Sequence, residues 1–487
     1  MRKLIITITF LTSIQLFSQD CDCLKNLKWL TETFEKNDAG FQYILDKKGE
    51  NRYLMHNEFY TKKASQISDL NECHKLLNDW TEFFRKDHLQ VQIVRNEQTN
   101  LSDKEIIEKY GNSERYEITP KAFKSYIDKL GLNTGYEGLW NSRAYTIGVV
   151  KDETNPNREY VGFIVESKHP YWQKNQVKFE IFKTEKAKYN MKYYMGDHSV
   201  RQFENIDLLG NNYLSIGSGF INLKRVLPKI ETEKNVEDYF RRKSSPKPIL
   251  ESISKNTLLL RIPSFERANK DLIDSLLDSN DKLIKNTQNL IIDLRGNGGG
   301  SDISYEKIKP YIYTNPIRKV GVEYLSTELN NSRMIKFMND PILSKDEKKR
   351  AKEGLEKLNK HLGEYISLNE NVVDIETHEN IYPNPVNVAV LINGSCGSTT
   401  EQFLLEAKQS KKVKLFGTTT LGSLDISNMH TVISPSKQFR LWYGLTKSYR
   451  IPGMAIDGKG IQPDYYFDRT IKPYEWVDKT VEILNNK

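Results

Sequence analysis

The sequence has little of what marks several specialised protein classes. Its 487 residues include only 27 glycines and 16 prolines, which excludes collagen-like and low-complexity chains. Beyond the first twenty residues, no apolar run approaches the roughly 20 residues that cross a bilayer, so we expect no transmembrane segment. The 72 Lys and Arg residues stand against 64 Asp and Glu residues, for a formal net charge of +8 without a concentrated basic stripe. We therefore expect no nucleic-acid partner.

Apolar residues, by contrast, are abundant. Hydrophobic residues make up 38% of the chain and aromatic residues 11%, which excludes a disordered protein. At about 150 residues per domain, the length predicts about three domains.

The first nineteen residues have the layout of a secretory signal peptide. Two basic residues precede the apolar run Leu4–Phe17, and the small residue Ser18 follows it. We expect a signal peptide over residues 1–19, a mature chain that starts between Ser18 and Cys21, and export to the periplasm or the medium. A lipid anchor would need a small residue directly before Cys21, where the sequence has Asp20 instead.

Four cysteines are present, at positions 21, 23, 73 and 396. In an exported protein, we expect Cys73 to bridge to Cys21 or Cys23, and Cys396 to stay free. Free buried thiols are the alternative. The Cys73-His74 pair and the Cys-x-Cys at 21–23 lack the usual spacing of zinc ligands, so we expect no metal.

Hydrophobic periodicity changes along the chain. Leucine and aromatic residues recur every three to four positions near the N-terminus, as in amphipathic helices, whereas short β-like runs separated by turn residues follow. The Lys-rich stretch Arg241–Lys247, flanked by prolines, is a candidate linker. The expected organisation is an N-terminal helical region over 20–110, a separate β-rich module over 117–240, and an α/β core over 248–487 with a charged helical insertion at about 327–368.

The last half of the chain predicts an α/β core with a mostly parallel sheet. Strand Thr257–Ile262, helix Asn269–Lys285 and strand Leu290–Leu294 follow one another, the order of a parallel crossover unit. A further strand at Val386–Ile392 precedes a helix at about Thr399–Gln409.

Two of these strands end in Gly-rich turns. Residues 293–300 read Asp-Leu-Arg-Gly-Asn-Gly-Gly-Gly, and residues 393–401 read Asn-Gly-Ser-Cys-Gly-Ser-Thr-Thr-Glu. The carboxyl ends of parallel strands are where α/β sheets place ligands. Glycine there leaves backbone N–H groups free to face a developing oxyanion, and Ser398 would stand beside them at a helix N-terminus.

Together with residues 458–464, which read Gly-Lys-Gly-Ile-Gln-Pro-Asp, these turns resemble the motifs of the tail-specific (C-terminal-processing) serine peptidases, an S41-like family. The resemblance covers about residues 250–470 and implies a ClpP/crotonase-like core. It places Ser398 on the nucleophile, Gly299 on the oxyanion glycine and Thr399 on the second backbone N–H. Family members often carry a PDZ module, but the β-rich module takes its place here, so C-terminal specificity is not carried over.

Three further residues of these motifs have supporting roles. Asp293 and Arg295 come from the first motif, and a pair between Arg295 and a carboxylate would brace the loop. Glu401 follows Ser398 by three residues. The same Ser-x-x-Glu spacing is a capping box, in which Ser398 would cap the helix without any catalysis. Cys396 is more in keeping with a small core residue than with a nucleophile.

The general base is where the sequence departs from the common family pattern. Much of the family has a Lys about 25 residues after the nucleophile, where this chain has Ser423. A tricorn-type branch uses a His from an N-terminal helical region, and His88 resembles it, with Asp457 at the late acid position. Nucleophile, base and orienter would then be Ser398, His88 and Asp457. His430 and Lys447 are the alternative bases.

The sequence thus predicts an exported serine endopeptidase that binds protein or peptide substrates in extended form and needs no cofactor. Because the usual Lys is missing, a protein of another class stays open: a non-catalytic peptide- or glycan-binding protein on a peptidase scaffold. Oligomeric state cannot be inferred from the sequence.

Overall fold

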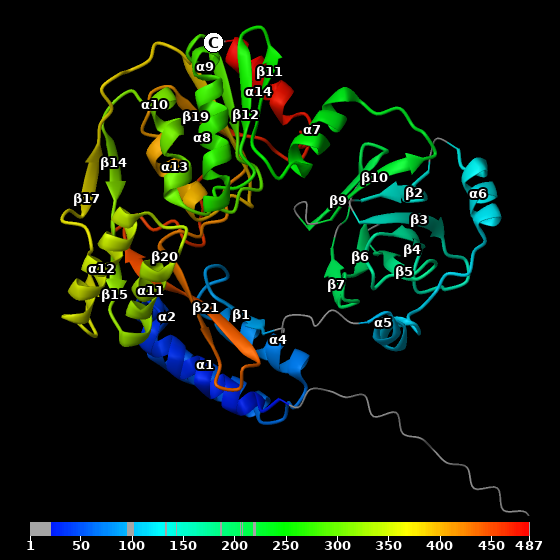
Figure 1. Ribbon diagram of the computed structural model, residues 1–487, viewed down its shortest axis with the longest axis horizontal. Helices are drawn as coiled ribbons and strands as arrows, with labels where there is room; N and C mark the ends of the chain where they lie inside the picture. The colour runs from blue at the N-terminus through cyan, green and yellow to red at the C-terminus, as the bar shows by residue number, and fades with distance from the viewer. Residues whose placement is uncertain are drawn as a thin grey trace, which may run out of the picture. The chain divides into compact units, whose positions relative to one another are not determined.

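The computed structural model describes residues 21–94 and 102–486, apart from 132, 133, 143, 186, 187, 205, 207 and 218–220. The predicted signal peptide lies outside these residues. The chain divides into two compact units, each built from separate stretches of sequence (Figure 1). Unit 1 combines residues up to 95 with 320–373 and 425–458, and unit 2 combines 96–319, 374–424 and 459–487. This interleaving differs from the consecutive domains that the sequence suggests, because strands far apart in the chain pair with each other.

Four helices form the N-terminal part of unit 1. Asp22 and Asp69 cap the first and the last of them by accepting hydrogen bonds from first-turn N–H groups. The apolar residues spaced three and four apart point inward, and Leu30, Phe34 and Trp80 are fully buried in one core. The helices are α1 (Cys23–Asn37), α2 (Phe41–Lys48), α3 (Glu50–Ala64) and α4 (Leu70–Thr81).

A five-stranded sheet completes this core. The N-terminal strand β1 pairs antiparallel with β21, which also pairs with β20 and β15. Phe439, Leu441 and Tyr443 of β21 are buried in the same cluster as the helices. The strands are β1 (Gln90–Ile93), β15 (Val322–Leu325), β16 (Tyr365–Ile366), β20 (Ile426–Ile433) and β21 (Phe439–Ser448).

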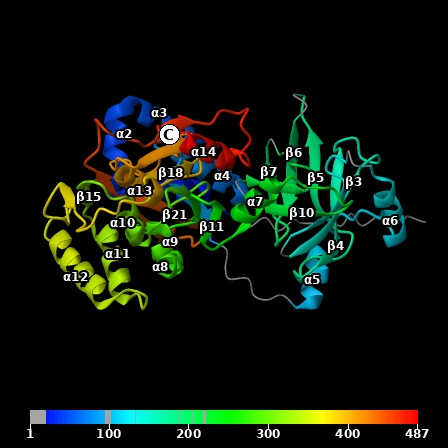
Figure 2. The ribbon, with the colours of Figure 1, turned by 90° about the horizontal axis from the view of Figure 1, so that it is seen from above.

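The charged stretch 327–368 contains two helices, α11 (Glu328–Asn339) and α12 (Lys345–Asn359), which lie side by side (Figures 1 and 2). Thr327 and Ser344 cap them, and Ser344 forms a complete capping box with Glu347.

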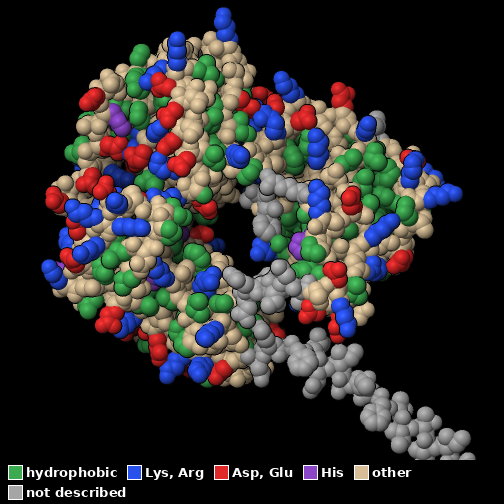
Figure 3. All heavy atoms as spheres, in the orientation of Figure 1, with side chains coloured by type: hydrophobic (Ala, Val, Ile, Leu, Met, Phe, Trp, Pro, Cys, Tyr) green, Lys and Arg blue, Asp and Glu red, His purple; other side chains and the backbone are tan. Residues whose placement is uncertain are grey.

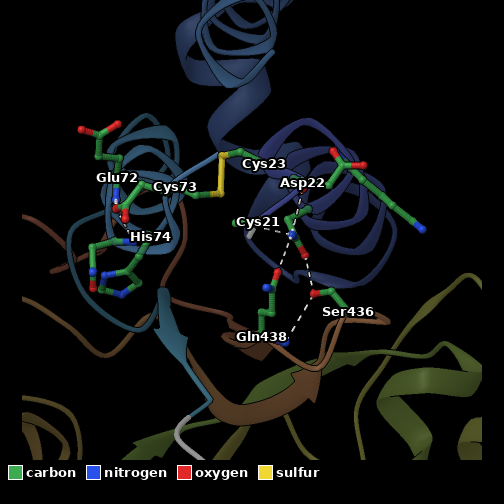
Figure 4. Close-up of a disulfide and its surroundings, with 12 residues drawn as sticks. Cys21, Asp22, Cys23, Glu72, Cys73, His74, Ser436 and Gln438 are labelled. Carbon is green, nitrogen blue, oxygen red and sulfur yellow. Dashed lines mark hydrogen bonds between the residues drawn. A yellow bond between two sulfur atoms is a disulfide. The ribbon is translucent and has the colours of Figure 1, made fainter. Parts of the chain in front are cut away.

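A disulfide joins the ends of two helices in unit 1. Cys23 at the start of α1 is bonded to Cys73 in α4 (Figure 4), which confirms one of the two predicted pairings. Cys21 takes no part in the bridge, and its sulfur accepts a hydrogen bond from Asn26. Asn26 in turn contacts Ser436 and Gln438 beside β21, so the bridge lies next to the sheet.

Unit 2 contains a nine-stranded sheet whose strand pairs are antiparallel. Runs of consecutive buried residues along β3, β4 and β5 pack around an aromatic core that includes Trp140 and Phe179. Helices α5 (Asp103–Tyr110) and α6 (Pro120–Lys129) precede it. The strands are β2 (Gly138–Asn141), β3 (Tyr145–Lys151), β4 (Tyr160–Ser167), β5 (Val177–Lys183), β6 (Tyr189–Tyr194), β7 (Val200–Phe203), β8 (Leu208–Leu209), β9 (Tyr213–Ile216) and β10 (Ile221–Leu227).

The predicted linker at Arg241–Lys247 is wrong in its first half. Helix α7 runs over Lys234–Ser244 and lies beside β11 (Figures 1 and 2). Arg241 and Arg242 both form ion pairs with Glu251 of β11, and these contacts hold the end of the helix against the sheet.

The second sheet of unit 2 carries the Gly-rich turns. Its order is β11-β12-β13-β18-β19-β22, and all of its strand pairs are parallel except β11 with β12. The five-stranded and nine-stranded sheets are antiparallel, so the described part of the chain is a mixed fold in which this six-stranded sheet is mainly parallel. The strands are β11 (Ile249–Ser254), β12 (Thr257–Arg261), β13 (Asn289–Asp293), β18 (Asn387–Ile392), β19 (Val413–Gly417) and β22 (Tyr465–Tyr466).

Helices pack around this sheet. Trp476 and Val477 of the C-terminal helix join Leu259, Ile291 and Leu391 of the strands in one core. The helices are α8 (Lys270–Ser279), α9 (Asp281–Lys285), α10 (Lys309–Ile312), α13 (Thr399–Ala407) and α14 (Trp476–Asn485), and β14 (Ile317–Val320) and β17 (Val373–Glu376) form a separate two-stranded sheet.

Lys and Arg side chains are interspersed with Asp and Glu side chains over the visible face (Figure 3). Within the described residues, no helix combines the length and the hydropathy that spanning a membrane requires.

Candidate active site

Ser398 lies on a strained turn between a strand and a helix. The chain leaves β18 at Ile392 and enters α13 at Thr399, and Ser398 between them has φ +54°. Such a backbone conformation costs a non-glycine residue about 1–3 kcal/mol and is typical of functional turns. Its N–H donates to the carbonyl of Ser423 at 2.9 Å, and its side chain is partly exposed. The side chain does not cap α13, so the capping-box alternative is wrong.

Gly299 lies directly against this turn. Its φ is +107°, and a Cβ placed there would stand 2.8 Å from the Cβ of Ser398, the N of Thr399 and the carbonyl oxygen of Gly397. The Oγ1 of Thr400 donates to the carbonyl of Asn297 at 2.9 Å and ties α13 to the same loop. The two Gly-rich turns therefore meet, as their positions at the carboxyl ends of adjacent parallel strands predict.

The two backbone N–H groups beside Ser398 differ in whether they already donate a hydrogen bond. The Thr399 N–H is at the first position of α13, where it has no partner within the helix. The Gly299 N–H, in contrast, donates to Oδ1 of Asn297 at 3.0 Å. The side chain of Asn297, for which the sequence predicted no role, thus binds the N–H of Gly299, the predicted oxyanion glycine.

Asp293 and Arg295 form a buried pair under this loop. The carboxylate of Asp293 accepts from the Nε and Nη2 of Arg295 at 2.9 and 2.8 Å, and from the Arg295 backbone N–H. Although burial raises the pKa of Asp293, the Arg295 guanidinium outweighs it and lowers that pKa to about 2. The pair stays ionised at neutral pH and braces the loop, as predicted for Arg295.

Glu401 fixes the loop that supports Ser398. Its fully buried carboxylate accepts from the backbone N–H groups of Gly422 and Ser423 at 2.8 and 2.7 Å. Since the carbonyl of Ser423 in turn accepts from the Ser398 N–H, Glu401 positions the turn of Ser398 indirectly.

Cys396 is a core residue. Its side chain is fully buried, and its thiol donates to the carbonyl of Leu294 at 3.1 Å. Burial raises the pKa of this thiol to about 12, which keeps it protonated and unreactive at neutral pH.

His88 belongs to unit 1 and has a defined tautomer. It precedes β1, has φ +54°, and its Nδ1 lies 2.7 Å from the carbonyl oxygen of Ile426. Because a carbonyl only accepts, Nδ1 carries the proton and Nε2 keeps its lone pair. Burial lowers the pKa of His88, while the Ile426 carbonyl and the Asp457 carboxylate oppose that shift. The imidazole is therefore mainly neutral at pH 7, the form that a general base requires.

Asp457 supports His88 through the backbone. Its carboxylate accepts from the N–H groups of Asp425 and Ile426 at 2.6 and 3.1 Å, and Ile426 is the residue whose carbonyl holds His88. Asp425, which the sequence did not single out, accepts from the N–H of Asp457 at 2.8 Å and pairs with Arg450 at 2.9 Å.

A second pair that sequence reasoning missed holds the His88 backbone. Nη2 of Arg85 donates to the His88 carbonyl at 3.0 Å, and the same guanidinium forms a buried ion pair with Asp38. No motif marks Arg85 or Asp38, although an Arg three residues before a His on a turn is a local signal for such a bond.

The two alternative bases also lie in unit 1. Lys447 in β21 forms an ion pair with Glu323 at 3.0 Å and stacks on Tyr365. His430 in β20 is buried, and burial, followed by the charges of Lys336 and Arg333, lowers its pKa to about 4. His430 follows Ile426 by four residues in β20, and its Nε2 lies 3.4 Å from Oγ of Ser332 in α11.

The structure thus brings Ser398, Gly299, Thr399, Asp293, Arg295 and Glu401 together in unit 2, and His88 with Asp457 in unit 1. The first cluster offers a hydroxyl beside a free helix N–H, and the second offers a neutral imidazole with a fixed lone pair. These are parts that acyl transfer uses. Among the described residues, no group of three or more His, Cys, Asp and Glu side chains is arranged to hold a metal ion.

Comparison with known proteins agrees with this chemistry. Residues 256–467 match the model of peptidase family S41. The crystal structure of mature CPAF aligns with a TM-score of 0.50 and 12% identity over 96% of this chain and 98% of that one. Mature CPAF complexed with lactacystin aligns with a TM-score of 0.50 and 13% identity, covering 96% and 99%. These two likenesses show a shared fold. No curated protein sequence matches the chain significantly.

All three motifs on which the resemblance rests lie inside the matched segment, at residues 293–300, 398–401 and 458–464. The turn of Ser398 and the loop of Gly299 meet there, at the carboxyl ends of β18 and β13. Residues 256–467, under half of this chain, therefore match peptidase family S41, and this match supports a serine-type peptidase.

Proposed function

We propose that this protein is an exported endopeptidase that cleaves peptide bonds through an acyl-enzyme on Ser398. One observation carries the proposal: Ser398 is held at φ +54° in contact with Gly299, beside the N–H of Thr399. The parallel order of β12, β13, β18 and β19 supports the ClpP/crotonase-like core that the motifs imply.

His88 takes the proton of the Ser398 hydroxyl as the oxygen attacks the substrate carbonyl. It then gives that proton to the leaving amine, and water hydrolyses the resulting ester with the same base. The defined tautomer supports this role, since the lone pair of Nε2 is the one available for Ser398. Asp457 acts on the base through Ile426, and the N–H groups of Thr399 and Gly299 receive the oxyanion. Gly299 can contribute only if its N–H is shared with, or leaves, Asn297.

Chain connectivity supports the pairing of Ser398 with His88. Ser398 is bonded to the carbonyl of Ser423, and His88 to the carbonyl of Ile426. These two anchoring residues are three positions apart, and three residues span at most about 10 Å. This short connection between the two anchoring residues supports the proposal that Ser398 and His88 act together.

The substrate is a protein or peptide bound in extended form, as peptides commonly are when they add to the edge of a sheet. Export rests on the basic residues and the apolar run at the N-terminus. N-terminal sequencing of protein recovered from the periplasm or medium should find a start between Ser18 and Cys21. A soluble cytoplasmic form that retains Met1 would contradict export.

The test of the catalytic proposal is covalent labelling with a fluorophosphonate probe and mapping of the modified residue. The label should map to Ser398 and be lost in Ser398→Ala. Ser395→Ala, which removes a hydroxyl from the same loop, is the matched control and should label normally.

A non-catalytic peptide- or glycan-binding scaffold is the second candidate. The observations that favour it are Ser423 at the usual Lys position and the Gly299 N–H already engaged by Asn297. A folded wild-type protein that never labels and cleaves no peptide would support this candidate and exclude the first.

A further inference from the structure

Unit 2 has a second feature at the carboxyl ends of its parallel strands, a cavity of about 220 Å³. Helix α7 contributes Tyr239, Arg242 and Lys243 to its wall. Arg261, at the end of β12, and the Asp293–Arg295 pair, at the end of β13, form the opposite side. Tyr239 stacks on Arg295, with 5.0 Å from the guanidinium carbon to the ring centre, which fixes α7 over the strands.

The charges that line this cavity do not balance. Four cationic side chains face one carboxylate, that of Asp293. The carboxylate of Asp293 is already paired with Arg295. Arg242 is paired with Glu251 and Asp238, two residues that do not line the cavity. Arg261 donates only to the carbonyls of Ile262 and Asp293, both at 2.9 Å. Within the described part of the chain, neither Lys243 nor Arg261 forms an ion pair.

A buried guanidinium, that of Arg261, and a half-buried ammonium, that of Lys243, are costly for the free protein when they have no counter-ion. Burial, followed by the charges of Arg295 and Arg261, lowers the pKa of Lys243 to about 8. Burial also lowers the pKa of Arg261, with Asp293 opposing and Arg295 adding to the shift. An anion between the two side chains would supply the missing partner and favour both charged forms.

The wall of the cavity and the predicted oxyanion glycine belong to the same loop after β13. Gly296 forms part of its wall and precedes Gly299 by three residues, a span of at most about 10 Å. An extended peptide advances about 3.3 Å per residue, so a peptide that reacts beside Gly299 and runs toward Gly296 would reach this cavity within about three residues of the reacting carbonyl.

We propose that this cavity binds a carboxylate of the peptide substrate, between Lys243 of α7 and Arg261 of β12. The inference rests on the proposed function and adds a preference for acidic substrates to it. The planar guanidinium of Arg261 suits the two oxygens of a carboxylate, and Lys243 adds a point charge. The carboxylate belongs either to an Asp or Glu side chain or to the peptide C-terminus.

Kinetics on matched peptides tests the preference. A neutral parent peptide with Gln at the four positions on each side of the cleaved bond is compared with variants carrying Glu at one position. A further pair differs only in a C-terminal acid or amide. We expect one of these carboxylates to raise kcat/KM about tenfold to a hundredfold in the wild type, as a charge-assisted hydrogen bond does. A rise with Glu at one position would identify a side-chain carboxylate as the ligand. A rise with the C-terminal acid over the amide would identify the peptide C-terminus.

Lys243→Met should abolish this preference, so that the acidic and the neutral peptide are cleaved with equal kcat/KM. Lys247→Met, which removes a neighbouring exposed lysine, is the matched control and should keep the preference. Arg261→Lys retains the charge and should weaken the preference without abolishing it. Equal cleavage of acidic and neutral peptides by the wild type would overturn the proposed cavity and leave the peptidase function intact.

Binding separates this inference from catalysis. The same peptides are titrated calorimetrically into Ser398→Ala, and into Ser398→Ala combined with Lys243→Met. We expect the acidic peptide to bind Ser398→Ala about tenfold more tightly than its neutral match, and the double variant to lose that difference. Equal affinity of both peptides, or no binding of either, would overturn the inference even if the protein proved not to be a peptidase.

Discussion

Gly299 and Ser398 are in such close contact that the loop of β13 leaves no room for a side chain beside the candidate nucleophile. A methyl group at Gly299 would stand 2.8 Å from the Cβ of Ser398 and 2.8 Å from the N of Thr399. The neighbouring Gly298 has open space around it. A side chain would therefore clash with the turn of Ser398 at Gly299 but not at Gly298.

Gly299→Ala should lower kcat/KM at least about a hundredfold, because the added Cβ displaces Ser398 or the Thr399 N–H from a geometry that tolerates little error. The φ of +107° adds backbone strain. Gly298→Ala is the control and should stay within a few-fold of the wild type. Steady-state kinetics measures kcat/KM of both variants, and thermal unfolding checks that both are folded. Equal activity of the two variants would show that Gly299 is not at the reacting centre.

His88→Ala should lower turnover at least about a hundredfold with folding intact, since it removes the proposed base. A neutral imidazole is required, so activity rises with pH through the pKa of His88. Burial lowers that pKa below 6.5, which places the rising limb below pH 6.5 and a plateau at neutral pH. A pH–kcat/KM profile measures the limb. A rise centred near pH 9 would indicate a lysine base instead.

Lys447→Ala and Ser423→Ala should change turnover little. The ammonium of Lys447 is held by Glu323 and lies on the Tyr365 ring, and Ser423 acts through its backbone carbonyl. Fluorophosphonate labelling of each variant is the measurement. If Lys447→Ala abolishes labelling of Ser398 while His88→Ala leaves it unchanged, a Ser–Lys dyad replaces the proposed triad.

Acid should destabilise the protein between about pH 6.5 and pH 4. Burial lowers the pKa of His430 to about 4, so below pH 6.5 the unfolded chain binds a proton that the folded chain excludes. The free energy of unfolding is therefore not reduced by His430 above pH 6.5. As the pH falls toward 4, protonation of His430 in the unfolded chain lowers it by up to roughly 3 kcal/mol. Urea unfolding at pH 7, 5.5 and 4.5 measures the loss. His430→Asn should reduce this dependence, and an unchanged slope would refute the assignment.

Reduction should destabilise the helical part of unit 1. The bridge between Cys23 and Cys73 closes a loop with a sequence separation of 50, for which chain entropy predicts up to about 4 kcal/mol. Cys73→Ser should therefore lower the unfolding free energy by about 2–4 kcal/mol and make it insensitive to reductant. Cys21→Ser leaves the bridge in place and should keep that sensitivity. Peptide mapping without reductant that finds Cys73 alkylated would contradict the bridge.

The features that the sequence predicts correctly are local. Ser398 and Gly299 stand in Gly-rich turns at strand ends, and the pairing of adjacent parallel strands brings such turns together. The alternative prediction of a capping box is wrong although the Ser-x-x-Glu spacing is present. Ser398 has φ +54°, and the carboxylate of Glu401 accepts from the backbone of Gly422 and Ser423 instead. Spacing alone does not reveal which way a side chain turns.

The features that the sequence did not predict depend on distant partners. The end of α7 was taken for a linker from its composition, whereas Arg241 and Arg242 are held by Glu251. Arg85 and Asp38 lie 47 residues apart, and neither belongs to a motif. Such pairs become visible only when the fold has placed them.

The pairing of β1 with β21 also sets when the environment of His88 can form. β1 ends at Ile93 and β21 begins at Phe439, so the ribosome adds roughly 350 residues between the two. At about 5–20 residues per second this takes roughly 20–70 s, during which His88 has neither the neighbouring strand nor the carbonyl of Ile426. Under the proposed mechanism, the growing chain cannot cleave other nascent proteins until β20 and β21 have been made and His88 has gained its neighbours.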